Sequence, residues 1–154
     1  MQVKHWLIAA VAIASALPCV AKAATTDPYI VVYRASGVTD DGNGFVATVV
    51  FCTNLSPVAE NVAFILRKAD GSSAYFNTVT LNSTQTYTVG TRAASTFVLS
   101  ANAATGAIQQ GFLSIGSTTM SITCSAMVVN PTTTPPSGMS LHMQRYNPAP
   151  NTMD

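Results

Sequence analysis

The stretch from Thr119 to Val129 alternates apolar side chains with hydroxyl side chains. A period of two gives a β-strand one apolar face and one polar face, whereas a helix requires a period near 3.6. The apolar positions of this stretch are Met120, Ile122, Cys124, Ala126 and Val128. The alternation therefore predicts a half-buried strand that packs on one side only.

Other β-branched or aromatic runs recur along the chain, and turn sequences such as Asp40-Asp41-Gly42-Asn43-Gly44 and Ala69-Asp70-Gly71-Ser72 separate them. No sustained helical period occurs, and residues 101–110 have room for one short helical turn at most. Short strands at this spacing predict an all-β, immunoglobulin-like antiparallel sandwich of about seven to nine strands. The expected strands are 29–36, 45–52, 61–68, 74–81, 84–91, 96–100, 107–115, 119–129 and 139–146.

The N-terminus has the pattern of a secretory signal peptide. Lys4 and His5 precede an apolar run from Trp6 to Pro18, and Ala21-Lys22-Ala23 fits the cleavage rule. We expect cleavage after Ala23, because the apolar run is short for a retained membrane anchor. A lipidated Cys19 is disfavoured, since Pro18 stands where a lipoprotein signal has a small residue. The expected location is secreted, periplasmic or at the cell surface.

Cleavage would leave two cysteines, Cys52 and Cys124. A pair of cysteines in an exported chain predicts a disulfide, with two buried free thiols as the alternative. One cysteine lies in an early strand and the other in a late one, which predicts an immunoglobulin-type bridge between the two sheets. Two features of true immunoglobulin domains are missing, because the only Trp lies in the expected signal peptide and Ile122 replaces the corner Tyr.

The expected layout is a signal peptide at residues 1–23, a sandwich domain at 24–130, a Thr/Pro linker at 131–138, and an edge strand with an irregular tail at 139–154. The runs 84–91 and 139–146 are the expected edge strands of the sandwich. Substituting Lys for Thr86 or Thr88 is expected to block pairing of the first of these edges with a second copy, without disturbing the core.

No arrangement of residues predicts catalysis, so we expect no enzyme and no cofactor. His142 would be the only histidine of the processed chain, and no nucleophile-elbow motif accompanies any Ser. Asp40, Asp41 and Asn43 could offer oxygens to Ca²⁺, but an ordinary turn is favoured because their spacing misses the Ca²⁺-loop pattern. Met139, His142 and Met143 could offer soft ligands to Cu(I), although core packing explains the methionines better.

Three segments resemble a group of short exported bacterial β-sandwich proteins of unassigned function. They are Phe51-Cys52-Thr53-Asn54, Cys124-Ser125-Ala126-Met127-Val128, and Leu141-His142-Met143-Gln144-Arg145-Tyr146-Asn147-Pro148. The resemblance implies an exported β-sandwich and implies no activity.

Charge is scarce in this chain, at 8% of residues, while Thr and Ser are abundant. The net charge of +1 gives no basic surface for nucleic acid. Neutral hydroxyl-rich strand edges do not repel a second copy of themselves. We therefore expect a secreted non-enzymatic structural or adhesive protein of the envelope or extracellular space, whose copies could self-associate by pairing at an edge. The alternative is a small module that binds a surface glycan or another protein, with the five tyrosines as possible contact residues.

Overall fold

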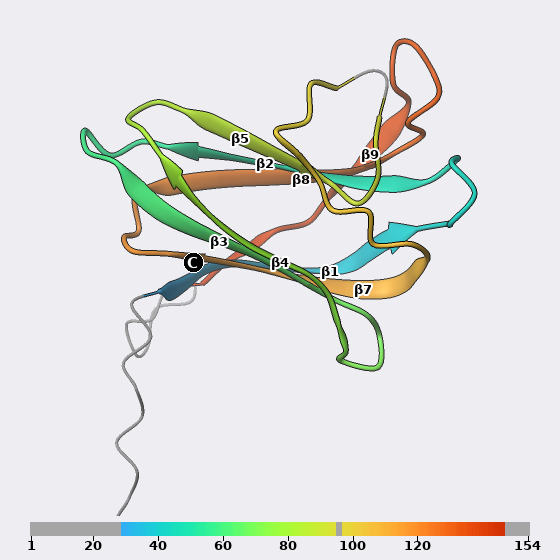
Figure 1. Cartoon of the computed structure of the whole chain (residues 1–154), viewed down its shortest axis with the longest axis horizontal. Helices are drawn as coiled ribbons and strands as arrows, with labels where there is room; N and C mark the ends of the chain where they lie inside the picture. Colours follow the sequence, from blue (N-terminus) through green and yellow to red (C-terminus); the bar gives the residue numbers. More distant parts are fainter. Residues whose placement is uncertain (1–28, 95–96, 147–154) are drawn as a thin grey trace, which may run out of the picture.

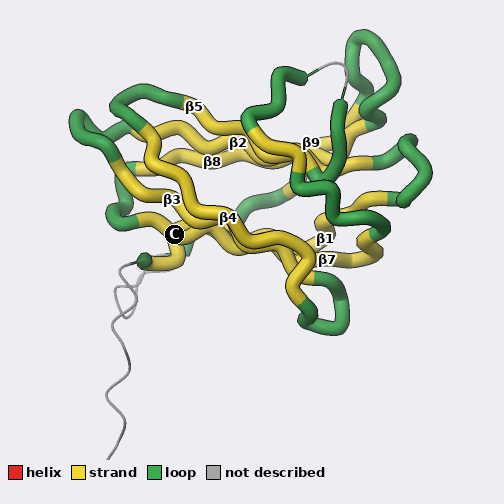
Figure 2. The backbone as a smooth tube through the Cα atoms, in the orientation of Figure 1, coloured by secondary structure: helices red, strands yellow, loops and turns green. Residues whose placement is uncertain are grey.

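Two five-stranded sheets face each other in the computed structural model, which describes residues 29–94 and 97–146 (Figure 1). The expected signal peptide and the end of the tail lie outside these residues. No helix occurs in the described part of the chain (Figure 2). The expectation of an all-β protein built from two sheets is therefore confirmed.

The first sheet has the strand order β10-β1-β7-β3-β4, and all its strand pairs are antiparallel. The second sheet has the order β6-β5-β2-β8-β9, with one short parallel pair between β5 and β6. The described residues thus form ten strands, of which two are only two residues long. Their bounds are β1 Ile30–Asp40, β2 Ala47–Asn54, β3 Glu60–Arg67, β4 Ser73–Leu81, β5 Thr86–Gly90, β6 Ala101–Asn102, β7 Ile108–Ser117, β8 Ile122–Val129, β9 Gly138–Leu141 and β10 Gln144–Arg145.

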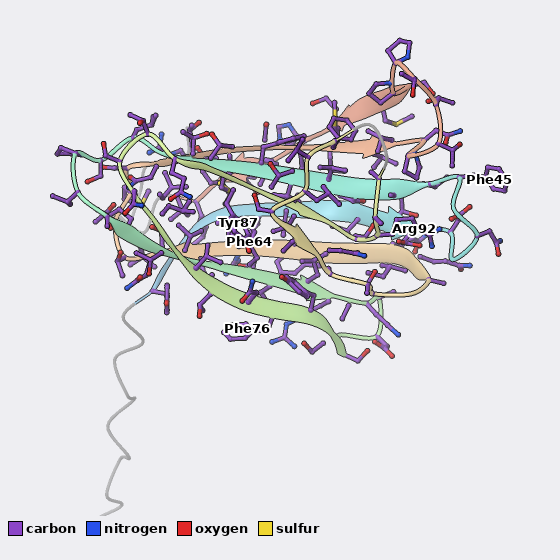
Figure 3. The ribbon with its side chains drawn as sticks, turned by 45° about the horizontal axis from the view of Figure 1, so that its top comes forward. Phe45, Phe64, Phe76, Tyr87 and Arg92 are labelled. Atoms are coloured by element: carbon purple, nitrogen blue, oxygen red, sulfur yellow. A yellow bond between two sulfur atoms is a disulfide. The ribbon has the colours of Figure 1, made fainter. Side chains whose placement is uncertain are left out.

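The main core lies between the sheets and consists of the inward side chains of alternating strand positions. Phe64 of β3 and Tyr87 of β5 meet there, with ring centroids 5.7 Å apart (Figure 3). The largest fully buried side chains include Phe64, Leu66, Leu81, Ile108, Leu113, Ile115 and Ile122. This interdigitation of apolar side chains from both sheets stabilises the fold as a whole.

A second, smaller cluster covers the outer face of the second sheet. Phe97 and Leu99 pack there against Val49 and Val129, and the Phe97 ring lies 5.8 Å from that of Phe51. The expectation of a strand at 96–100 is wrong for the described residues 97–100, which form a loop over the sheet. The apolar residues that suggested a strand pack on the sheet from outside.

The disulfide is formed, but it does not join the two sheets. Cys52 and Cys124 lie opposite each other on neighbouring strands β2 and β8, with Cα atoms 4.2 Å apart. The expected bridge between sheets is wrong, because β8 returns to lie beside β2 even though 72 residues separate the cysteines. Cys52 is fully buried, so the bridge lies on the core side of the second sheet.

Candidate functional site

Strand β4 is the long exposed edge of the first sheet. It pairs with β3 along its whole length, and no other described strand pairs with its opposite side. An edge strand presents unpaired N–H and C=O groups, which proteins commonly protect with Lys, Pro or bulges. The sequence SAYFNTVTL contains neither Lys nor Pro nor any other charged residue. Its one register irregularity lies at the end near Ser73.

The two faces of β4 differ in character. Tyr75 and Val79 point inward and pack against the main core, whereas Phe76, Thr78 and Thr80 are exposed. Phe76 is 62% exposed and points away from the body of the sandwich (Figure 3). This free edge therefore combines available backbone hydrogen-bonding groups with an exposed aromatic ring.

The β3–β4 turn holds the edge in a defined register. Gly71 has φ +81°, a conformation that suits glycine at a turn. The carboxylate of Asp70 accepts the Ser72 N–H at 2.9 Å, and the hydrogen bonds from Ser72 lower the pKa of Asp70. Arg67 donates to the Gly71 carbonyl at 3.0 Å. Arg67, Lys68 and Asp70 thus lie at the turn end of the hairpin, Glu60 lies at its other end, and β4 itself is neutral.

The expectation that residues 84–91 form an outer edge is wrong. Strand β5 lies between β2 and β6, and Ser100 and Ala103 donate backbone hydrogen bonds to its outer side. Thr88 is only 7% exposed, so Lys at this position would disturb packing. The Thr86 hydroxyl lies 2.8 Å from that of Thr53, a pairing that Lys would remove.

The other expected edge, residues 139–146, lies at the rim of both sheets. Strand β9 ends the second sheet beside β8, and strand β10 ends the first sheet beside β1. The chain therefore crosses from one sheet to the other within a few residues and closes this side of the sandwich. Both of these edge strands are short, in contrast to β4.

The Asp40-Asp41 turn serves a structural role. Asp40 is fully buried and forms a two-point ion pair with Arg92, whose Nε donates to Oδ2 at 3.0 Å and whose Nη2 donates to Oδ1. The Asp40 hydrogen bonds and charge raise the pKa of Arg92. This occupied carboxylate is not available as an open Ca²⁺ ligand.

Asp41 caps the same turn by accepting backbone N–H groups. Its Oδ1 accepts from Gly44 at 2.9 Å and Asn43 at 3.0 Å, and its Oδ2 accepts from Phe45 at 3.1 Å. Desolvation raises the pKa of Asp41, but these hydrogen bonds outweigh it and lower the pKa to about 2. The sequence analysis identified both aspartates, and the structure assigns them to holding a turn.

The residues considered for Cu(I) do not lie in one cluster. Met139 is 71% exposed in β9, Met143 packs against the main core, and His142 is exposed between β9 and β10. Among residues 29–94 and 97–146, no group of three or more His, Cys, Asp or Glu side chains is placed to hold a metal ion. His142 instead lines a shallow pocket with Arg34 and Gln144.

The aromatic residue that dominates the exposed edge was missed in the sequence analysis, which considered tyrosines. Tyr33 is buried, and Tyr75 and Tyr87 pack against the core. The available signal was the alternation within 74–81, where Phe76 shares its parity with Thr78. That parity places the phenylalanine on the solvent side.

No family model, curated protein or solved structure matches this chain. The resemblance to exported bacterial β-sandwich proteins therefore stays a prediction. A search of the described residues also finds no helix of the length and apolarity needed to cross a bilayer.

Proposed function

We propose that this chain is an exported, non-enzymatic structural or adhesive protein of the cell envelope or extracellular space, and that copies associate through strand β4. The observation that carries the proposal is the free edge of β4, nine residues long and uncharged. Edge strands of this kind pair readily with a further strand through main-chain hydrogen bonds.

A second copy of this chain is the occupant that fits the edge. Antiparallel pairing of β4 with β4 places Thr, Asn and aromatic side chains opposite one another and brings no like charges together. The pairing is self-complementary, as a twofold interface requires, and it joins two five-stranded sheets into one continuous sheet. Addition at any other edge meets a strand of at most four residues in the described chain.

The engagement of the titratable groups supports a role without catalysis. Ion pairs join Arg92 to Asp40, and Asp41 accepts backbone hydrogen bonds from its own turn. Glu60 is buried, and the Thr118 hydroxyl donates a hydrogen bond to it at 2.6 Å. An active site would need such groups to converge on a cavity with their polar atoms available.

The disulfide is consistent with an oxidising extracellular or periplasmic environment. Together with the signal-like N-terminus, it supports export of the chain. The immunoglobulin-like description of the sandwich also stays a proposal. The two-sheet layout supports it, while a disulfide within one sheet is unlike the bridge of antibody domains.

The alternative function is a small module that binds glycans or another protein. The exposed ring of Phe76 favours it, because exposed aromatic side chains are common contact residues in recognition surfaces. In that case β4 would receive a strand or ligand from a different molecule, and the purified protein would stay monomeric.

Sedimentation of Thr78→Lys against a matched control tests the proposal. Thr78 lies at the middle of the free edge and Thr123 lies on the interior strand β8, and both are exposed. Thr78→Lys should weaken the dimer at least tenfold, since it brings two positive charges close together near the middle of the paired edges, while Thr123→Lys should leave association unchanged. A wild-type protein that is monomeric at high concentration would contradict the proposal, as would equal behaviour of the two variants.

A further inference from the structure

The outer face of the first sheet holds a shallow pocket at the side away from β4. It is formed where β10 pairs with β1, and register places Gln144 opposite Arg34 and Phe112 opposite Ser36. We call this the β1–β10 pocket, and its lining residues are Arg34, Ala35, Ser36, Phe112, His142 and Gln144.

Arg34 brings a positive charge to the pocket that no described carboxylate balances. The ion pairs of the described residues all belong to Arg92. The remaining described carboxylates are engaged elsewhere, Glu60 with Thr118 and Asp70 in the β3–β4 turn. The pocket therefore has a net attraction for an anionic group.

The Arg34 guanidinium is also held in place before any ligand arrives. Its carbon lies 4.7 Å from the centre of the Tyr146 ring, in cation–π contact. A guanidinium held over an aromatic ring can still offer the edge of its plane for two parallel hydrogen bonds to a carboxylate. A restrained arginine loses less side-chain entropy on binding than a mobile one.

The remaining lining residues suit a sugar. Gln144 and Ser36 offer both donors and acceptors to hydroxyl groups, and His142 adds ring nitrogens. Phe112, which is half-buried, offers an apolar surface for the C–H face of a pyranose ring. Carboxylate recognition, hydroxyl hydrogen bonds and an aromatic surface occur together here.

We propose that the β1–β10 pocket binds an acidic saccharide, with the uronate carboxylate on Arg34 and the ring against Phe112. This site is separate from the self-association edge, because β10 and β4 are opposite ends of one sheet. A dimer through β4 would carry two such pockets, which raises the avidity for a polymer with repeated uronate units.

Calorimetric titration with tetragalacturonate tests the site. Arg34→Gln should weaken binding roughly tenfold or more by removing a two-point charged contact, and Arg34→Lys should recover only part of the loss. The matched control is Lys68→Gln, since Lys68 is an exposed cation between β3 and β4 and does not line the pocket. It should change affinity less than twofold, and thermal unfolding should show that Arg34→Gln is folded.

Three results would overturn the proposal: no binding of the tetramer, equal losses in Arg34→Gln and Lys68→Gln, or acetate binding as tightly as the tetramer. The last result would define a general carboxylate site without sugar recognition. A neutral tetramer such as cellotetraose should bind much more weakly. Thr78→Lys should retain the affinity for monomeric galacturonate, so failure of self-association and failure of this pocket can be told apart.

Discussion

At the scale of single residues, Asp40, Asp41 and Arg92 show how a nearly uncharged chain uses the few charges it has. Asp40 is fully buried, and the Arg92 guanidinium satisfies both of its oxygens. A buried carboxylate without such a partner would be strongly unfavourable. Asp41 satisfies the backbone N–H groups of the following turn. These charges fix the connection between β1 and β2, and thereby one end of both sheets.

The pH dependence of stability should reveal the role of Asp41. Its pKa is about 2 in the folded protein against 3.8 for the unperturbed group, so the unfolded chain takes up its proton first as the pH falls. The stabilisation is therefore complete above about pH 4 and is lost as the pH falls toward 2. Asp41→Asn should be less stable at neutral pH, and its deficit should shrink over this interval. Urea unfolding at several pH values measures it, and a pH-independent deficit would contradict the assignment.

At the scale of strands, the alternation of apolar and polar residues predicted where the strands lie in the sequence better than it predicted which strands pair with each other. The run 119–129 became β8 at Ile122–Val129, with Ile122 and Ala126 buried as its pattern indicated, but the expectation that it packs on one side only is wrong, because Met127 and Val129 pack in the cluster on the outer face. The expected strand at 107–115 became β7 at Ile108–Ser117, the middle strand of the first sheet, although it contains Gln109, Gln110 and Gly111. A Cβ on Gly111 would lie 2.5 Å from Ile108 Cγ2 and 2.8 Å from the Arg67 carbonyl oxygen, so close packing requires glycine at this position.

The order of the strands could not be obtained from local patterns. Which strand lies beside β2 depends on pairing between segments far apart in the chain, and this is why the disulfide was expected between sheets. The free edge was missed for the same reason. The run 74–81 has the alternation of an ordinary strand, and only the sheet order shows that nothing described covers its outer side.

The Cys52–Cys124 bridge should account for a large share of the stability. Cross-linking strands 72 residues apart restricts the unfolded chain, and reduction or Cys124→Ala should lower the free energy of unfolding by about 2–5 kcal/mol. Denaturant unfolding with and without reductant measures the loss. Mass spectrometry after alkylation of the unreduced native protein should find neither cysteine modified, and two alkylated thiols would show that the bridge is absent in solution.

At the scale of the whole molecule, the two sides of the sandwich differ in structure. The side of β9 and β10 is closed by a segment that crosses between the sheets, whereas the side of β4 ends in a long uncharged strand (Figure 1). Soluble monomers ordinarily carry enough surface charge to repel their own copies. The scarcity of charge in this chain is therefore consistent with association at this edge. The central claim is that β4 of one copy pairs with β4 of another.

Mixing two oppositely charged edge variants tests that claim most directly. Thr78→Lys and Thr78→Glu should each sediment as monomers, because an antiparallel β4–β4 pair with its twofold axis near the middle of the strand brings the two identical charges close together. An equimolar mixture should form a 1:1 dimer in analytical ultracentrifugation, since Lys and Glu then attract each other across the paired edges. The same mixture made with Thr123 variants should behave as the wild type does. A Thr78 mixture that remains monomeric while the wild type dimerises would place the interface elsewhere and contradict the account.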